Sequence, residues 1–302
     1  MNAVPTTLKN TAIDKFINMK KRFILVFLFL LPFINVKASE PKLYELPRSQ
    51  VIPIQDTQSN RQYELYIKLP ENYEKNSDKK YPVIYFTDAA WHIEILSAAT
   101  EFLMEEAILV GVSWQKDINE DLKKEHGVHV SRFRDYSIKQ SSNSKIQAKY
   151  QLGQANNHLN FIRENVIKYI EKNYQTHPEK RTYFGYSAGG EFGAYVLLTQ
   201  PDTFKNYILG SPAIKGDIPF LSKLTSATTK PLNANVFISY GTLEKEVGEH
   251  IEQFITMLKN RNDKSLSLKH PVIEGSHQTA FPLTGIRSVT WLSHLQKEED
   301  KS

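Results

Sequence analysis

One serine in the second half of the chain has the surroundings of an enzyme nucleophile. Ser187 is the centre of Gly185-Tyr186-Ser187-Ala188-Gly189, which fits the nucleophile-elbow pattern Gly-x-Ser-x-Gly. In an elbow the serine lies on a sharp, strained turn between a strand and a helix. Bulky residues two positions before or after the serine would clash with the neighbouring strand and helix, which explains the two glycines. The alternative is a glycine-rich turn with a structural serine. Because a β-rich run precedes the motif and an apolar helical run follows it, the sequence predicts that Ser187 is a nucleophile.

The base that would activate this serine is predicted from its place in the chain. Hydrolases with such an elbow carry serine, acid and histidine in that order. His277 lies in IEGSHQTAF, after the last predicted strand and before the last predicted helix, where the base belongs. His270 falls within the strand and His250 on a helix, so both are poorer candidates. His277 is therefore the predicted general base.

The acid of a triad should follow the preceding strand. The sequence NVFISYGTLEKE places Glu244 there, with Glu246 two residues further on. A carboxylate at this point would hold the correct imidazole tautomer and stabilise the imidazolium. Glu244 is the predicted acid. The alternative is that Glu244 is an exposed side chain and that Ser187 and His277 act as a dyad.

Two backbone N–H groups are needed to stabilise the oxyanion of the reaction. One is expected from Ala188, which follows the nucleophile, and the second from the loop FTDAAWH after the strand that ends at Phe86. Ala90 is the predicted second donor, with Ala89 as the alternative, because small residues let backbone approach the substrate. Asp88 in this loop is expected to order the turn rather than to take part in chemistry.

Alternating strand and helix patterns indicate how these residues are positioned. QYELYIKLP predicts an antiparallel strand, and the continuous apolar runs at 81–86 and 107–114 suit strands buried on both faces. Further strands are expected at RTYF, YILG, NVFISYG and LSLKHPVIEG, and helices at 162–174, 188–199, 247–258 and 285–295. This order predicts one domain, residues 39–302, with a mainly parallel sheet flanked by helices. The loops at the carboxyl ends of its strands should meet.

A long polar segment, about residues 115–151, interrupts this pattern. It contains Arg132, Arg134 and several serine and asparagine residues. Loops of this length inside a compact domain are usually functional or mobile. The segment is therefore predicted to be a polar loop at the active site.

The N-terminal segment has the features of a secretory signal. Residues 1–38 carry six basic residues and one acidic residue, which account for the whole net charge of +5, because the remainder has 32 of each. A basic start at residues 20–22 precedes an apolar run at 23–33 and the cleavage site Val36-Lys37-Ala38. The sequence predicts a signal peptide over 1–38, with Met19 a candidate true start, and an exported protein in the periplasm or outside the cell. The alternative is an uncleaved N-terminal anchor.

Several other functions are not favoured. Once the signal is removed, the balanced charge gives no reason to expect a nucleic-acid partner, and no membrane span is expected in the mature chain. The chain has no cysteine, so it has neither a disulfide nor a lipoprotein anchor. Histidine spacing typical of a metal site is absent, and His126 with His129 is a weak pair. A phosphate loop and a dinucleotide fingerprint are also absent, so no metal or cofactor is predicted.

Five sequence stretches together resemble the "putative esterase" family of α/β-hydrolases. They are YPVIYFTDAAW, RFRDYS, YFGYSAGGEFGAYVLL, FISYGTLEKE and EGSHQTAFP, and the resemblance covers about Leu43 to Leu295. The family includes siderophore esterases, esterase D, feruloyl esterases and mycolyltransferases. The exported siderophore-type esterases are the most similar subgroup. The resemblance implies an α/β-hydrolase fold, with Ser187 as nucleophile and His277 as base.

The resemblance also implies where the substrate lies. An arginine of the RFRDYS region faces the substrate in siderophore-type members, which corresponds to Arg132 or Arg134 here. The alternative for Arg134 is a pair with Asp135 that fixes the loop. Trp91, at the end of the YPVIYFTDAAW stretch, is expected to contact the substrate as well. Where many members have glycine after the aspartate of this loop, the chain has Ala89.

The sequence thus predicts a serine ester hydrolase that acts through an acyl-enzyme on a small-molecule ester, with a siderophore lactone, in its ferric or iron-free form, as the favoured substrate. Two alternatives use the same fold. The first is an acyltransferase, in which an alcohol outcompetes water for the acyl-enzyme. The second is a binding protein without catalytic activity.

Overall fold

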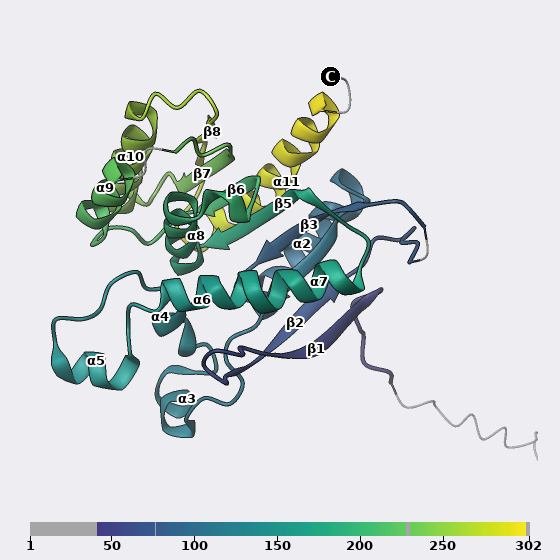
Figure 1. Cartoon of the computed structure of the whole chain (residues 1–302), viewed down its shortest axis with the longest axis horizontal. Coiled ribbons are helices and arrows are strands. Elements are labelled where there is room, and N and C mark those ends of the chain that lie inside the picture. The colour runs from purple at the N-terminus through teal and green to yellow at the C-terminus, as the bar shows by residue number, and fades with distance from the viewer. Residues whose placement is uncertain (1–40, 76, 228–229, 300–302) are drawn as a thin grey trace, which may run out of the picture. The chain divides into compact units, whose positions relative to one another are not determined.

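A nine-stranded sheet forms the centre of the computed structural model, which describes residues 41–75, 77–227 and 230–299. The strand order is β1-β2-β4-β3-β5-β6-β7-β8, and β9 also pairs with β7. β1 and β2 pair antiparallel, as do β2 and β4, whereas all other pairs are parallel. This is the predicted α/β-hydrolase fold, with a mainly parallel sheet (Figure 1). The strands are β1 (Ser49–Gln55), β2 (Gln62–Lys68), β3 (Tyr81–Phe86), β4 (Ile108–Val112), β5 (Thr176–Tyr186), β6 (Asn206–Gly210), β7 (Asn235–Gly241), β8 (Ser267–Lys269) and β9 (Val272–Ile273).

The burial of each strand follows its sequence pattern. Every residue of β3 and β4 is buried, as their continuous apolar runs predict, because helices cover both faces of the sheet there. β2 alternates between buried and partly exposed residues over most of its length. The expected strand LSLKHPVIEG is divided into β8 and β9, and His270 lies between the two.

Two hydrophobic cores lie on opposite faces of the sheet. One face packs against α6 (Ala155–Phe161), the π-helical segment η1 (Ile162–Ile167), α7 (Lys168–Asn173), α8 (Ala188–Thr199), α9 (Ile218–Ala227) and α10 (Lys245–Asn260). The other face packs against α2 (Ala89–Leu103) and α11 (Ala280–Glu299), as Figure 1 shows. The four predicted helices are present. The last begins five residues earlier than expected, and α6, η1 and α7 form one continuous rod.

The segment at 115–151 is only partly a loop. It contains α3 (Glu120–His126), α4 (Ser131–Asp135) and α5 (Ser144–Tyr150), which lie together in Figure 1. Asparagine side chains begin two of these helices: Asn119 accepts the N–H groups of the first turn of α3, and Asn143 does so for α5. The short helices make this segment an ordered structure above the carboxyl edge of the sheet.

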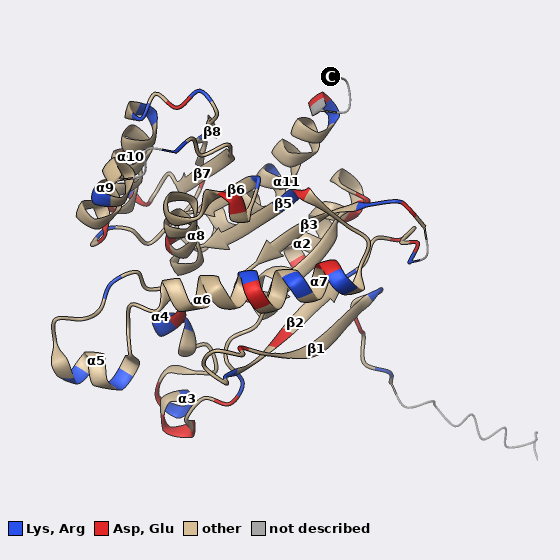
Figure 2. Ribbon diagram, viewed as in Figure 1, with Lys and Arg blue, Asp and Glu red and all other residues tan. Residues whose placement is uncertain are grey.

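Charged residues are interspersed along the described chain. Figure 2 shows basic and acidic positions alternating along α7 and around α3. No helix within the described ranges has the length and apolar character needed to cross a bilayer. The predicted signal peptide, residues 1–38, lies outside the described residues.

Candidate active site

Ser187 lies on a strained turn between β5 and α8. Its backbone has φ 58° and ψ −119°, a conformation that is costly for a residue with a side chain. Neighbouring backbone holds it there, because its N–H donates to the Gly210 carbonyl at 2.8 Å and its carbonyl accepts the N–H of Ala213 at 3.0 Å. The Ser187 hydroxyl does not cap α8. The turn therefore presents the hydroxyl at the carboxyl edge of the sheet, as the elbow motif predicts.

The two flanking glycines are required by close packing. A Cβ on Gly185 would collide with the carbonyl of Gly189, and a Cβ on Gly189 would collide with the Thr87 hydroxyl. The carbonyl of Gly189 also accepts a hydrogen bond from the Tyr183 hydroxyl at 2.7 Å. The loop after β3 and the elbow after β5 therefore touch, and these are the two segments that carry the predicted oxyanion donors.

His277 and Glu244 form a directly paired base and acid. His277 Nδ1 lies 2.6 Å from Glu244 Oε1, and the second carboxylate oxygen accepts the Gly241 N–H at 2.7 Å. The Glu244 side chain is only 5% exposed, whereas that of His277 is 38% exposed. This pairing directs Nδ1–H toward the carboxylate and leaves Nε2 available to accept a proton. The burial of Glu244 does not match the exposed side chain that was expected in the dyad alternative.

Tyr186 connects the base to the elbow. The Tyr186 hydroxyl donates to the His277 carbonyl at 2.7 Å, and the two rings lie 5.2 Å apart. Because Tyr186 directly precedes Ser187, this contact anchors the histidine loop beside the nucleophile. The structure thus gathers Ser187, His277 and Glu244 at one edge, from three loops that are far apart in the sequence.

A fourth polar residue, which the sequence analysis did not single out, completes this group. The Ser211 hydroxyl lies 2.6 Å from Glu244 Oε1 and 3.1 Å from His277 Nδ1. Ser211 follows the last residue of β6 and is fully buried. The one signal for it in the sequence is its position directly after a predicted strand.

The proposed oxyanion donors lie at the N-termini of two helices. Ala188 is the first residue of α8, and Ala89 and Ala90 begin α2. Trp91 and His92 donate their N–H groups to the Asp88 carbonyl, whereas a helix N-terminus leaves the earlier N–H groups without an intrahelical acceptor. Ala90 is exposed and Ala89 is fully buried. This favours Ala90 as the second donor.

Asp88 orders the loop between β3 and α2. Its side chain is fully buried and accepts hydrogen bonds from Trp114 Nε1 at 2.6 Å and from Arg132 Nε at 3.0 Å and Nη2 at 3.1 Å. Its own backbone is left-handed, with φ 55°. A carboxylate at the start of α2 is also favoured by the helix dipole. These contacts match the structural role predicted for Asp88.

Trp91 and Arg132 lie beside the oxyanion loop. The Arg132 guanidinium stacks 5.2 Å from the centroid of the Trp91 ring, which also contacts Trp114 and His129 at centroid distances of 4.7 and 5.0 Å. Trp91 is 47% exposed, whereas the Arg132 side chain is 13% exposed. The indole therefore offers an aromatic surface to solvent, with a cation packed against it.

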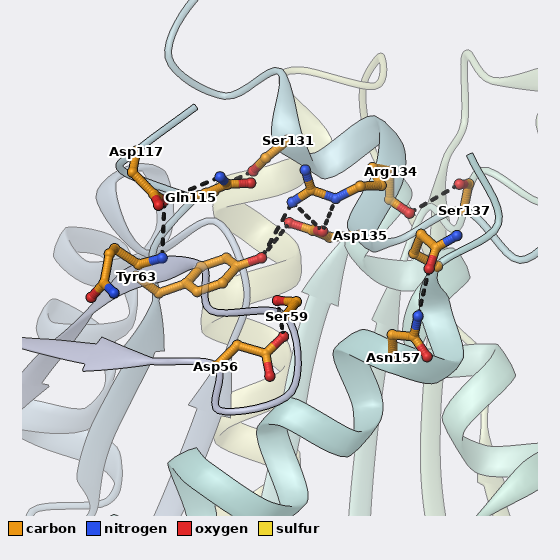
Figure 3. Close-up of polar contacts among 12 residues, drawn as sticks. Asp56, Ser59, Tyr63, Gln115, Asp117, Ser131, Arg134, Asp135, Ser137 and Asn157 are labelled. Atoms are coloured by element: carbon orange, nitrogen blue, oxygen red, sulfur yellow. Dashed lines mark hydrogen bonds and ion pairs between the residues drawn. The ribbon is translucent and has the colours of Figure 1, made fainter. Parts of the chain in front are cut away.

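Arg134 does not join Arg132. Its Nε donates to Asp135 at 2.8 Å and its Nη2 donates to the Tyr63 hydroxyl at 3.3 Å; Figure 3 shows these contacts. Its side chain is 9% exposed. The expectation that Arg134 faces the substrate is therefore not retained, because its donors are used within the protein. Arg134 instead fixes the base of the segment at 115–151, the alternative given above.

Comparison with known proteins identifies the family. A family model described as "Putative esterase" matches residues 57–275. The chain belongs to this esterase family. A relative, ferri-bacillibactin esterase BesA from Bacillus subtilis (strain 168), is 28% identical over 215 residues, which cover 67% of this chain and 73% of BesA.

Solved structures agree on the fold. The BES protein from Bacillus cereus has a TM-score of 0.71 at 23% identity and covers 84% of this chain and 98% of its own. The siderophore hydrolase EstB from Aspergillus nidulans has a TM-score of 0.68 at 18% identity, covering 83% and 96%. The enterobactin hydrolase IroE in complex with DFP has a TM-score of 0.63 at 19% identity, covering 82% and 97%. The chain is thus a member of an esterase family, and it has the α/β-hydrolase fold.

Burial and charge set the protonation of groups near the elbow. Burial opposes the charge of Arg132, but the attraction of Asp88 outweighs it and holds the pKa of the guanidinium above its usual value. Burial lowers the pKa of His129, and Arg132 adds to this effect. Burial and the nearby Asp217 raise the pKa of Glu191, one turn after Ser187, to about 8. At neutral pH Arg132 is therefore charged, whereas Glu191 is mainly protonated.

No group of acidic residues and histidines within the described ranges is arranged to hold a metal ion.

Changing Asp88 to asparagine is expected to destabilise the protein by about 3–5 kcal/mol, because it leaves the Arg132 cation buried without its counter-charge. Asparagine keeps the size of aspartate and tolerates the left-handed backbone, so the substitution removes the charge and one of the two acceptor oxygens without changing the shape. Urea denaturation would measure the change. The control is Asp202→Asn, at an exposed pair with Arg163, with an expected change of less than about 1 kcal/mol. Equal unfolding midpoints for Asp88→Asn and the wild type would contradict this role for Asp88.

Proposed function

We propose that the chain is an exported serine esterase that hydrolyses the ester bonds of a siderophore. The observation that carries the catalytic part is the 2.6 Å pairing of His277 Nδ1 with the buried Glu244, beside the strained elbow at Ser187. The substrate class is supported by the relatives, which are described as a ferri-bacillibactin esterase and siderophore hydrolases.

In the first half of the reaction the Ser187 hydroxyl attacks the ester carbonyl carbon. Its proton passes to His277 Nε2, and Glu244 stabilises the imidazolium that results. The carbonyl oxygen becomes an oxyanion, which accepts hydrogen bonds from the N–H groups of Ala188 and Ala90. When the tetrahedral intermediate collapses, the alcohol leaves with the proton of His277, and the acyl group remains on Ser187.

Water completes the reaction by the same route. His277 takes a proton from a water molecule that attacks the acyl carbonyl, and the same two N–H groups stabilise the second oxyanion. Collapse returns the proton to the Ser187 oxygen and releases a carboxylic acid. Ser187, His277 and Glu244 return to their starting states, so no reactant other than the ester and water is required.

The surface beside the oxyanion loop suits an aromatic acyl group. The exposed Trp91 ring can stack on a flat aromatic group, while the guanidinium of Arg132 packed against it is paired with the buried Asp88. A triscatecholate trilactone carries such aromatic groups, so it is the proposed substrate class. Export is supported by the basic, apolar and small-residue pattern of residues 20–38, and the periplasm or the extracellular space is the proposed location.

A substrate panel tests this function. It contains ferric and apo triscatecholate trilactones, hydroxamate siderophore esters, feruloyl esters and p-nitrophenyl acetate. We expect the highest kcat/KM for a trilactone. Changing Trp91 to alanine should raise KM for the trilactone about tenfold, or about 1.4 kcal/mol, by removing the stacking surface. The same change should alter kcat/KM for p-nitrophenyl acetate less than about twofold, because that ester carries no large aromatic acyl group.

The matched control is Phe102→Ala at the far end of α2, where the side chain is 82% exposed. It should change neither activity. Equal effects of Trp91→Ala on both esters would argue against the aromatic subsite. A wild type that cleaves p-nitrophenyl acetate but no siderophore ester would overturn the substrate class. Transfer of the acyl group to an added alcohol in preference to water would favour the acyltransferase.

A further inference from the structure

Ser211 closes a triangle of hydrogen bonds with the base and the acid. Its hydroxyl lies 2.6 Å from Glu244 Oε1, which is itself 2.6 Å from His277 Nδ1, and the hydroxyl lies 3.1 Å from that nitrogen. A serine hydroxyl has one proton to donate and two lone pairs that accept. It can therefore donate to the carboxylate while accepting part of the Nδ1–H bond of the imidazole.

The triangle accounts for both oxygens of the glutamate. Oε1 accepts from Ser211 and His277, and Oε2 accepts the Gly241 N–H at 2.7 Å. Each of these hydrogen bonds restricts rotation of the Glu244 carboxylate. Without the Ser211 hydroxyl, Oε1 would be held by the imidazole alone, whose Nε2 gains and loses a proton during the reaction. A fixed donor that takes no part in proton transfer keeps the acid in place.

The backbone of Ser211 is itself unusual. Its φ is 39°, in the left-handed region that favours glycine, and the residue is fully buried. Its N–H donates to the Ser239 carbonyl at 2.7 Å, so the strand neighbour holds this conformation. Glycine would relieve the strain but would have no hydroxyl. Strain retained at a buried polar residue points to a use for its side chain.

The same segment also supports the nucleophile. Gly210, directly before Ser211, accepts the Ser187 N–H, and Ala213, two residues later, donates to the Ser187 carbonyl. The turn after β6 thus contacts the elbow through its backbone and contacts the acid and base through one side chain. Ser211 is the point at which these two sets of contacts meet.

We propose that Ser211 is a positioning residue that holds Glu244 and His277 in register with Ser187, which extends the triad to four residues. This inference rests on the proposed function, because it acts through the triad assigned there. Ser211 does not touch the substrate, and its loss should therefore lower kcat without changing KM.

The first experiment compares Ser211→Ala and Ser211→Gly with the wild type on p-nitrophenyl acetate. We expect kcat to fall about tenfold in both variants, with KM within about twofold, because each loses the hydroxyl. The rate of labelling by a fluorophosphonate should fall in parallel. The glycine variant keeps the test valid if the alanine variant folds poorly, because glycine adopts the backbone of Ser211 without strain.

The second experiment tests whether Ser211 acts through Glu244. In a Glu244→Ala background, Ser211→Ala should lower kcat less than it does in the wild type, since one of the two partners of the hydroxyl, the acid, is gone. In the same background, Ser211→Asp should raise kcat at least tenfold. The aspartate carboxylate would lie near the present position of the Ser211 hydroxyl, which is 3.1 Å from His277 Nδ1, so it could accept the Nδ1–H in place of Glu244. Aspartate also tolerates the positive φ of this position.

Two results would overturn the proposal. One is a kcat for Ser211→Gly within twofold of the wild type. The other is an equal loss from Ser211→Ala with and without Glu244, which would show a structural effect independent of the acid. These outcomes differ from failure of the proposed function, which would appear as a wild type that neither cleaves p-nitrophenyl acetate nor reacts with the fluorophosphonate.

Discussion

Changing Ser187 to alanine is expected to lower kcat/KM for p-nitrophenyl acetate by about 10⁴–10⁶-fold. Removing the hydroxyl removes the covalent pathway, and only the oxyanion donors and substrate binding remain to accelerate attack by water. Alanine keeps the strained backbone with its φ of 58°, so the melting temperature should stay close to that of the wild type. Steady-state kinetics and thermal denaturation of both proteins would measure the two effects.

A fluorophosphonate probe gives an independent measurement of the same claim. It should label the wild type once and leave Ser187→Ala unlabelled. Ser226→Ala serves as the control, because the hydroxyl of this exposed serine donates to the Ser222 carbonyl within its own helix, and both labelling and activity should be unchanged. Labelled Ser187→Ala, or activity within tenfold of the wild type, would show that another residue is the nucleophile.

The positions of the triad residues in the sequence were informative because the fold constrains them strongly. Parallel strands end at one edge of a sheet, so Ser187, Glu244 and His277 were expected to meet there once each followed a predicted strand. The glycines that flank Ser187 carried a further signal, since a side chain on either would collide with backbone or with Thr87. These constraints act on backbone and on residue type, which a sequence displays.

Side-chain directions in the segment at 115–151 were harder to predict. Arg132 and Arg134 looked equivalent in a loop, but both lie on α4, where each residue turns about 100° from the last. Two residues apart, they point in nearly opposite directions, one to Asp88 and the other to Asp135 and Tyr63. Helices of five to seven residues are too short to show a repeating pattern of apolar residues in the sequence. The main sequence signals for α3 and α5 were their N-cap residues, Asn119 and Asn143.

Ser211 was not predicted for a different reason. A serine after a strand is common, and the residues that give this one a role, Glu244 and His277, follow 33 and 66 positions later. Only their convergence at the edge of the sheet makes its hydroxyl part of the site. Contacts of this kind depend on three-dimensional proximity rather than on a local pattern.

Changing Glu244 to glutamine is expected to lower kcat by about 10³–10⁴-fold with little change in KM. Glutamine has nearly the same shape, but it has no charge to stabilise the imidazolium, and one of its two groups is a donor. To accept the Nδ1–H of His277 it must turn its amide nitrogen toward the Gly241 N–H, which now bonds Oε2 at 2.7 Å. If it turns the other way, the imidazole takes the tautomer that cannot accept the proton of Ser187.

Glu246→Gln is the matched control for this prediction. Glu246 lies two residues further on and pairs with Lys215 in solvent, with its side chain 68% exposed. Its change should leave kcat within about twofold, because an exposed ion pair contributes little. If instead Glu244→Gln retained nearly full activity, the enzyme would be a Ser187–His277 dyad. The buried carboxylate would then only anchor the loops after β6, β7 and β9, and its loss would be seen in stability rather than in kcat.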